Sequence, residues 1–359
     1  MLISLSIFIY ILGIYNSFHK KNNKIISFLL FFLVLILMGG VTNNPDYLNY
    51  QYIYDYNIPG LELGFSMLMD SARSLGFSYN VFRLIVIFVS LLFVNKFLNN
   101  LNVKKDLYWI IYIPYLMILD SIQIRNFLMI SLVLFGLKYL IENNSFKNNV
   151  IFLVIVIISS SIQKLGLFYL LFPFFLFFLR KSKHIFVYIF IIFFLSILLV
   201  TPDIYIPLLD FITNNFLIGT DQSFYLIRKV DLGFLVFWFL SFIILVVTFI
   251  YSNKVHRIIN PRDKSVIRIL SSFVFFSSLF IPLYIIDLTY WRLMRNAIPA
   301  FVIINLLILK KENRYFFNRQ ERLFLYSLNG IFIIIILFFE VLPILQSSFL
   351  PMFLENWMF

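Results

Sequence analysis

The sequence predicts an all-α, polytopic transmembrane helical bundle that forms a single domain over residues 1–359. Composition is the first indication, because 62% of the residues are hydrophobic and 13% are charged, against about 45–50% and about 25% in soluble globular proteins. The second indication is a series of long, nearly uncharged stretches, such as residues 25–41 and 232–250, each of about the length that crosses ~30 Å of hydrocarbon. Lipid offers the backbone no hydrogen-bond partner, so such stretches must be helical.

About twelve spans are expected from these stretches. They cover residues 2–18, 25–41, 81–94, 107–119, 127–141, 150–162, 165–179, 185–200, 232–251, 266–286, 293–309 and 323–339. With the N-terminus outside, most of the 29 Lys and Arg residues fall in inside loops and most of the 17 Asp and Glu residues fall outside, as the positive-inside rule requires. The net charge of +12 is therefore a sign of topology, and we expect no nucleic-acid partner.

The residues or motifs that several classes of enzyme need are absent from this sequence. It contains no cysteine, which excludes disulfides, thiol nucleophiles and cysteine metal sites. It also contains no P-loop, no G-x-G-x-x-G and no H-E-x-x-H motif. The histidines His19, His184 and His256 all fall in inside loops. We therefore expect no metal and no cofactor at an outward-facing site.

Two outward-facing segments, residues 42–80 and 201–231, are longer than turns require and are predicted to be functional loops. The first contains a helical pattern over residues 61–75. Its predicted apolar face consists of Leu61, Phe65, Leu68, Ala72 and Leu75. This short helix either lies in the outer membrane interface or simply packs on the bundle.

Span lengths predict that several charges lie below the outer membrane surface. The 32 residues between Lys147 and Arg180 reach only ~48 Å as helix, short of the ~60 Å that two crossings need, which places the hairpin tip at Gln163 and Lys164 within the membrane. The same reasoning applies to Asp120, Arg125, Arg292 and Arg295. These residues either line a polar cavity that opens outward or snorkel and pair with neighbouring acids.

Five short motifs, taken in order, resemble the EpsG-like, Wzy-type polysaccharide polymerases. They are Asp46-x-x-x-Tyr50, Glu62-x-Gly64-Phe65-x-x-Leu68, Ile124-Arg125-Asn126-Phe127-Leu128, the hairpin Ser160-Ser-Ile-Gln163-Lys-Leu-Gly, and Tyr290-Trp-Arg292-Leu-Met-Arg295. The family often has a histidine where this chain has Gln163, so we expect sugar binding rather than catalysis at that position.

The resemblance implies an inverting, metal-independent glycosyltransferase of GT-C-like architecture in the bacterial cytoplasmic membrane. Such an enzyme joins polyprenyl-diphosphate-linked oligosaccharide repeats into a capsule, exopolysaccharide or O-antigen type polymer, with its active site facing outward. The implied partners are the lipid-linked donor and acceptor, membrane lipids, a flippase and a chain-length regulator. Two other functions stay open, namely a transporter or flippase of lipid-linked oligosaccharide, and a glycan ligase.

This chemistry assigns roles to particular residues. Guanidinium groups stabilise a diphosphate leaving group through bidentate hydrogen bonds, and the residues expected to bind it are Arg125, Arg292, Arg295, Lys164 and Arg228. An acceptor hydroxyl needs a base, for which Asp46 and Glu62 are the candidates, although each acid could instead pair with an arginine. The residues expected to contact sugars are Tyr47, Tyr50, Gln163, Asp221 and Tyr290.

Overall fold

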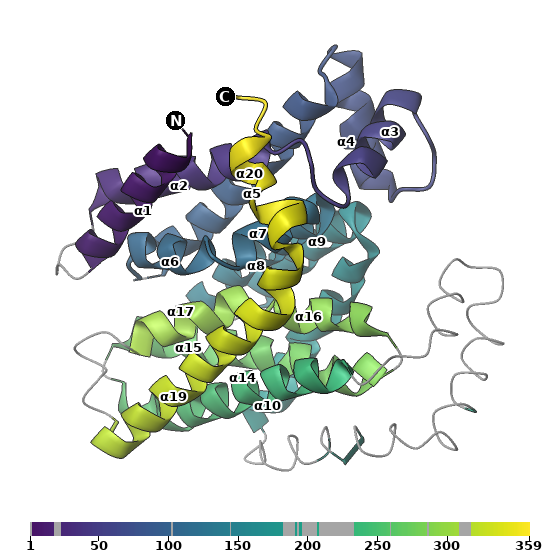
Figure 1. Cartoon of the computed structure of the whole chain (residues 1–359). Coiled ribbons are helices and arrows are strands. Elements are labelled where there is room, and N and C mark those ends of the chain that lie inside the picture. The colour runs from purple at the N-terminus through teal and green to yellow at the C-terminus, as the bar shows by residue number, and fades with distance from the viewer. Residues whose placement is uncertain are drawn as a thin grey trace.

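A computed structural model describes residues 2–17, 23–181, 233–308 and 317–359, apart from residues 102, 144, 259 and 286. Between 182 and 232 only residues 191, 194, 195 and 207 are described. The described residues form helices and no β-strand (Figure 1). The prediction of an all-α fold is thus confirmed.

The helices of the first half are α1 (Leu2–Ser17), α2 (Lys24–Gly40), α3 (Tyr47–Tyr56), α4 (Leu63–Ser74), α5 (Tyr79–Asn100), α6 (Lys105–Tyr112), α7 (Leu116–Ile122), α8 (Ile124–Glu142), α9 (Phe146–Ile162), the 3-10 helix η1 (Lys164–Leu171) and α10 (Phe172–Lys181). Those of the second half are α14 (Phe234–Lys254), η3 (Val255–Arg257), α15 (Pro261–Ser277), η4 (Ser278–Ile285), η5 (Leu288–Tyr290), α16 (Trp291–Arg295), α17 (Ile298–Ile308), α19 (Arg319–Ile336), the turns η6 (Leu337–Val341), η7 (Leu342–Ile344) and η8 (Leu345–Phe349), and α20 (Pro351–Leu354).

Six helical stretches in the described part of the chain are long and apolar enough to cross a membrane. They are Tyr79–Asn100, Ile124–Glu142, Phe234–Arg257, Pro261–Ile285, Leu288–Ile308 and Arg319–Leu354. Four shorter apolar helices accompany them. The count of about twelve spans and the GT-C-like architecture stay predictions, and the predicted segments 185–200 and 201–231 fall almost wholly outside the described residues.

Two of the predicted spans are interrupted at a proline. The span 107–119 is divided between α6 and α7, which meet around Pro114, and the span 266–286 changes from α15 into the 3-10 helix η4, which contains Pro282. Proline has no amide hydrogen and its ring clashes with the preceding turn, so a regular α-helix cannot continue through it. Neither predicted span is therefore one continuous α-helix. The segments after the breaks, α7 and η4, pack against α8 and α16.

The predicted helix over residues 61–75 is present as α4, but its buried face differs from the prediction. Phe65, Met69 and Ala72 are buried, whereas Leu68 and Leu75 are 41% and 69% exposed. The buried face is thus rotated about the helix axis relative to the predicted apolar face, and the two faces share only Phe65 and Ala72. Its place in a membrane interface stays a prediction.

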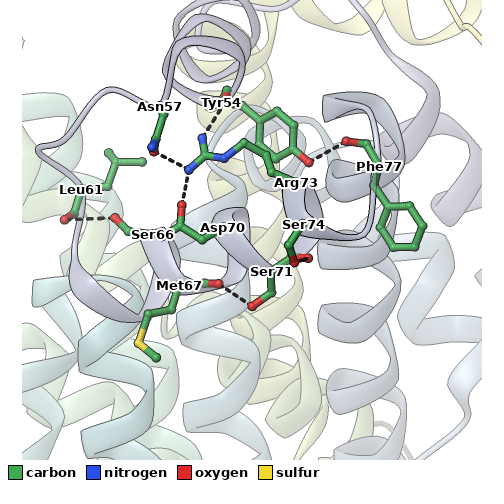
Figure 2. Close-up of polar contacts among 10 residues, drawn as sticks. All are labelled: Tyr54, Asn57, Leu61, Ser66, Met67, Asp70, Ser71, Arg73, Ser74 and Phe77. Atoms are coloured by element: carbon green, nitrogen blue, oxygen red, sulfur yellow. Dashed lines mark hydrogen bonds and ion pairs between the residues drawn. The ribbon is translucent and has the colours of Figure 1, made fainter.

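Helices α3 and α4 form a lobe at one end of the molecule (Figure 1) that is held together by Arg73. The Arg73 guanidinium donates to the Tyr54 carbonyl at 2.6 Å and to the Asn57 side chain at 2.5 Å, and it pairs with Asp70. The Tyr54 hydroxyl in turn donates to the Phe77 carbonyl at 2.7 Å (Figure 2). These contacts join the end of α3 to the C-terminal half of α4 and the residues after it, so the lobe is a defined platform rather than a loose loop.

Arg83 of α5 connects two chain segments next to this lobe. Its side chain is buried, with 1% exposure, and donates to the Val41 carbonyl at 2.5 Å and to the Ser121 carbonyl at 2.8 Å. Val41 leads into α3, and Ser121 lies just before α8. One guanidinium therefore connects the two chain segments that carry the candidate site.

Candidate functional site

Arg125 is the centre of a cluster of polar side chains from three helices. It lies in the first turn of α8, and its Nε donates to the Tyr50 hydroxyl of α3 at 2.6 Å. Its Nη1 pairs with the Glu62 carboxylate at 2.5 Å. The side chains of Arg125 and Glu62 are 22% and 15% exposed, so this charge-assisted hydrogen bond is partly open to solvent. The guanidinium also lies 5.2 Å from the centroid of the Tyr50 ring.

Glu62 reaches this cluster because α4 packs closely on the end of α9. A side chain at Gly64 would overlap Ser161, so glycine permits the close approach of the two helices. Glu62 stands at the N-cap position of α4 without capping that helix. Its carboxylate instead pairs with Arg125 and accepts the Lys164 backbone amide at 3.2 Å. The alternative role that the sequence left open for this acid, pairing with an arginine, is the one observed.

Asp46 lies at the start of α3 and differs from Glu62 in having no partner for its carboxylate. It makes no side-chain capping bond, and no hydrogen bond or ion pair joins its carboxylate to another described residue. Burial raises the pKa of Asp46, while the positive charges of Arg292 and Arg125 oppose that rise. Asp46 therefore lies within electrostatic reach of arginines from two helices, α8 and α16, and its carboxylate is available to a ligand.

The short helix α16 carries Arg292 and Arg295 and is docked against the start of α8. Arg295 is 6% exposed and donates to the Gln123 side chain. The next residue, Asn296, exchanges two hydrogen bonds with Asn126, at 2.8 and 3.2 Å. Arg292 is only partly buried. The two arginines thus have different surroundings although they share one helix.

The remaining predicted site residues are distributed unevenly. Tyr47 is buried beside Tyr79, with its hydroxyl bonded to Asn80, and lies over Arg83 rather than Arg125. Lys164 is exposed, and only its backbone amide contacts Glu62.

The neighbouring Gln163 has a buried Oε1 with no hydrogen-bond partner among the described residues. Tyr290 ends η5, directly before α16, and is partly buried. The predicted residues Asp221 and Arg228 lie outside the described residues.

A second polar cluster surrounds Arg295, and sequence reasoning missed its acid Glu340. Glu340 accepts hydrogen bonds from the Tyr115 hydroxyl at 2.9 Å and from the Trp291 indole. Asp120 accepts from the Tyr112 hydroxyl at 2.8 Å. The only signal in the sequence was the isolation of Glu340 within an apolar run, and the predicted span ended one residue before it, at 339, which assigned this acid to a loop.

Together these contacts describe a site with arginines, unpaired carboxylate oxygen and unpaired amide oxygen near one another. Such a set suits an anionic ligand that also carries hydroxyl groups. Within the described part of the chain, no three His, Asp or Glu side chains are grouped so that they could hold a metal ion.

Comparison with known proteins supports this interpretation. The EpsG family matches the chain over residues 25–353, nearly its whole length. Neither the curated proteins nor the solved structures contain a match to the chain. The matched region includes every described residue of both polar clusters. With six long apolar helices in the part of the chain that the structure describes, the chain is a multi-pass membrane protein, and it belongs to the EpsG family, whose function is polysaccharide polymerase-like.

Proposed function

We propose that this chain polymerises polyprenyl-diphosphate-linked oligosaccharide repeat units into a surface polysaccharide at the outer face of the bacterial cytoplasmic membrane. The observation that carries the proposal is that Arg125 pairs with Glu62 while Arg125 and Arg292 both lie within electrostatic reach of Asp46. Arginines are suited to a diphosphate and a carboxylate to an acceptor hydroxyl. Family membership supports the same chemistry.

The reaction is a displacement at the anomeric carbon of the donor sugar. The acceptor hydroxyl oxygen forms a bond to that carbon while the bond from the carbon to the diphosphate oxygen breaks. The bonding electrons leave with polyprenyl diphosphate, and the hydroxyl proton passes to a base. Attack from the face opposite the leaving group inverts the configuration of the anomeric carbon. The protein must therefore supply a base and stabilise a departing diphosphate.

Asp46 is the better of the two candidate bases. Its carboxylate has no hydrogen-bond partner among the described residues, whereas Glu62 is engaged by Arg125 and the Lys164 amide. A raised pKa also makes Asp46 a stronger proton acceptor than an ordinary aspartate. The proton of the acceptor hydroxyl is thus proposed to pass to Asp46.

Arg125 and Arg292 are proposed to bind the diphosphate and stabilise the charge that develops as it leaves. Both act electrostatically on Asp46, so a donor bound to them would lie next to the base. Arg125 gives Nη1 to Glu62 and Nε to Tyr50. A diphosphate that binds Arg125 through Nη1 and Nη2 would compete with Glu62 for the charge of that guanidinium.

Sugar contacts are proposed at Gln163, beside Lys164 and Glu62. Its buried Oε1 lacks a hydrogen-bond partner among the described residues, and an unsatisfied buried acceptor is costly. A sugar hydroxyl would supply the missing donor. Tyr290, which adjoins α16, is the second candidate.

The test is to incubate the purified protein with a lipid-linked repeat unit and look for a ladder of products. The unaltered chain should give the ladder, and Arg125→Ala should leave unpolymerised repeats. Arg262→Ala is the matched control, because it too removes a guanidinium that donates a hydrogen bond, to the Asn100 carbonyl at 2.6 Å. Asn100 ends α5, about 33 Å along that helix from its start near the site. A full ladder from Arg125→Ala would refute the role of Arg125.

One observation also favours a transporter or flippase as the second candidate. The broken segments at Pro114 and Pro282 pack beside polar residues, and discontinuous helices around a polar site are typical of transporters. Labelling of single introduced cysteines distinguishes the two functions, because the native chain has no cysteine. Labelling of one site residue from both membrane faces in turn favours transport. A ligase would transfer finished glycan to a different acceptor and produce no ladder.

A further inference from the structure

Glu340 is a charged residue in an otherwise apolar part of the chain. No other charge lies between Arg322 and Glu355. Glu340 belongs to the π-helical turn η6, and its neighbours Phe338 and Phe339 are 64% and 54% exposed. A carboxylate in such a segment is costly unless it is paired. The π turn, which adds a residue to the helical repeat, accompanies the inward position of this acid.

Both carboxylate oxygens of Glu340 accept a hydrogen bond, and the two donors come from distant parts of the chain. Oε2 accepts from the Tyr115 hydroxyl at 2.9 Å, and Oε1 accepts from the Trp291 indole. Tyr115 lies at the break between α6 and α7, and Trp291 is the first residue of α16. Glu340 therefore ties three elements together at one point.

The charged residues around Glu340 also connect it to α16. Arg295 lies within electrostatic reach of both Glu340 and Asp120. It also donates to the Gln123 side chain, two residues before Arg125. The charge of Arg295 is thus balanced by acids from two other segments. Arg292, on the same short helix, lies within reach of Asp46 instead.

We propose that Glu340 is a positioning residue of the polymerase site, because it fixes α16, which carries Arg292, against the α6–α7 break. This inference rests on the proposed function, in which Arg292 binds the diphosphate. Helix α16 has only five residues, so its own backbone hydrogen bonds give it little rigidity. Its orientation depends on side-chain anchors, and Glu340 at Trp291 and Asn126 at Asn296 hold its two ends.

The test measures kcat, KM and the Kd for inorganic pyrophosphate in the purified full-length protein. Glu340→Ala is expected to lower kcat/KM about 100-fold, since a misplacement of about 1 Å has this effect on a catalytic site, and to weaken pyrophosphate binding. Tyr115→Phe removes one of the two donors and should have a smaller effect in the same direction. In the Glu340→Ala background it should have no further effect, because the two residues act through one contact. Phe339→Ala, on the same turn but exposed, is the control and should leave all three constants unchanged.

Wild-type constants in folded Glu340→Ala, or additive effects of Glu340→Ala and Tyr115→Phe, would overturn the positioning role. If Glu340→Ala fails to fold, Tyr115→Phe decides alone, because it removes a hydroxyl and leaves the ring in place. Unchanged pyrophosphate binding and kcat/KM in Tyr115→Phe would then overturn the inference. A lack of polymer from the unaltered chain would overturn the proposed function instead, and pyrophosphate binding tests the placement of the arginines separately from it.

Discussion

Replacement of Glu62 by glutamine is predicted to tighten the binding of a diphosphate. Glu62 pairs with Nη1 of Arg125 at 2.5 Å, and this is the same group that a bidentate diphosphate would use. The carboxylate and the diphosphate therefore compete for one guanidinium. Glutamine retains an oxygen for the Lys164 amide, which Glu62 accepts at 3.2 Å, so the local shape is preserved while the competing charge is removed.

The size of the effect follows from the strength of the pair. A hydrogen bond to a charged group contributes about 1.5–3 kcal/mol. The two side chains are 22% and 15% exposed, so solvent screening places the pair at the lower end of that range. A difference of about 1.4 kcal/mol is a factor of ten in an equilibrium constant. The Kd for diphosphate should thus fall about tenfold in Glu62→Gln.

Titration calorimetry with inorganic pyrophosphate measures this change in the purified protein. Asp70→Asn is the matched control, because it removes one negative charge from the same helix and breaks the corresponding pair with Arg73. Asp70→Asn should leave the Kd unchanged. An equal or weaker affinity in Glu62→Gln would refute the competition, and an equal gain in Asp70→Asn would show that net charge alone is responsible.

Three further substitutions test other parts of the site. Asp46→Asn should lower kcat about 100-fold or more without weakening pyrophosphate binding. A base must be deprotonated and burial raises the pKa of Asp46, so kcat of the unaltered chain should fall as the pH is lowered through a midpoint above the usual value of about 3.9. This loss of kcat at low pH should be absent in the variant. Arg125→Lys should weaken pyrophosphate binding about tenfold or more, since an ammonium cannot bond Tyr50, Glu62 and a phosphate with the geometry of a guanidinium; affinity equal to that of the unaltered chain would contradict this. Gly64→Ala should lower the free energy of unfolding by about 1–3 kcal/mol in chemical denaturation, because the added methyl group meets Ser161, and Ser161→Gly in the same chain should restore part of the loss.

Hydropathy predicted the helices well because the membrane imposes them, but it could not predict where they break or turn. Pro114 and Pro282 interrupt predicted spans, and the consequence of a proline depends on which neighbours satisfy the freed backbone groups. At the other end of the chain, Pro343 follows the predicted span 323–339 closely. A helix end was the natural expectation there, yet the helical path continues through η6, η7 and η8 to α20, and Glu340 belongs to it.

Span lengths singled out Arg125, but depth alone does not identify partners. The pair of Arg125 with Glu62 joins residues 63 positions apart in the chain, and it depends on the close contact that Gly64 permits between α4 and α9. The sequence left each acid as either a base or an ion-pair partner. Only the three-dimensional contacts separate the two roles, with Glu62 paired and Asp46 unpaired among the described residues.

The arginines of the two polar clusters differ in how strongly acidic and polar partners hold them. This difference indicates which arginine can bind the substrate directly. Arg295 is 6% exposed, bonded to Gln123 and within reach of two acids that belong to the bundle. A ligand would have to displace buried partners to reach it, at a high desolvation cost. Arg125 is compensated by one acid on the α3–α4 lobe, in a pair that is partly open to solvent. A diphosphate can replace that acid charge for charge, which favours Arg125 as a direct ligand and Arg295 as the support that keeps α16 in place.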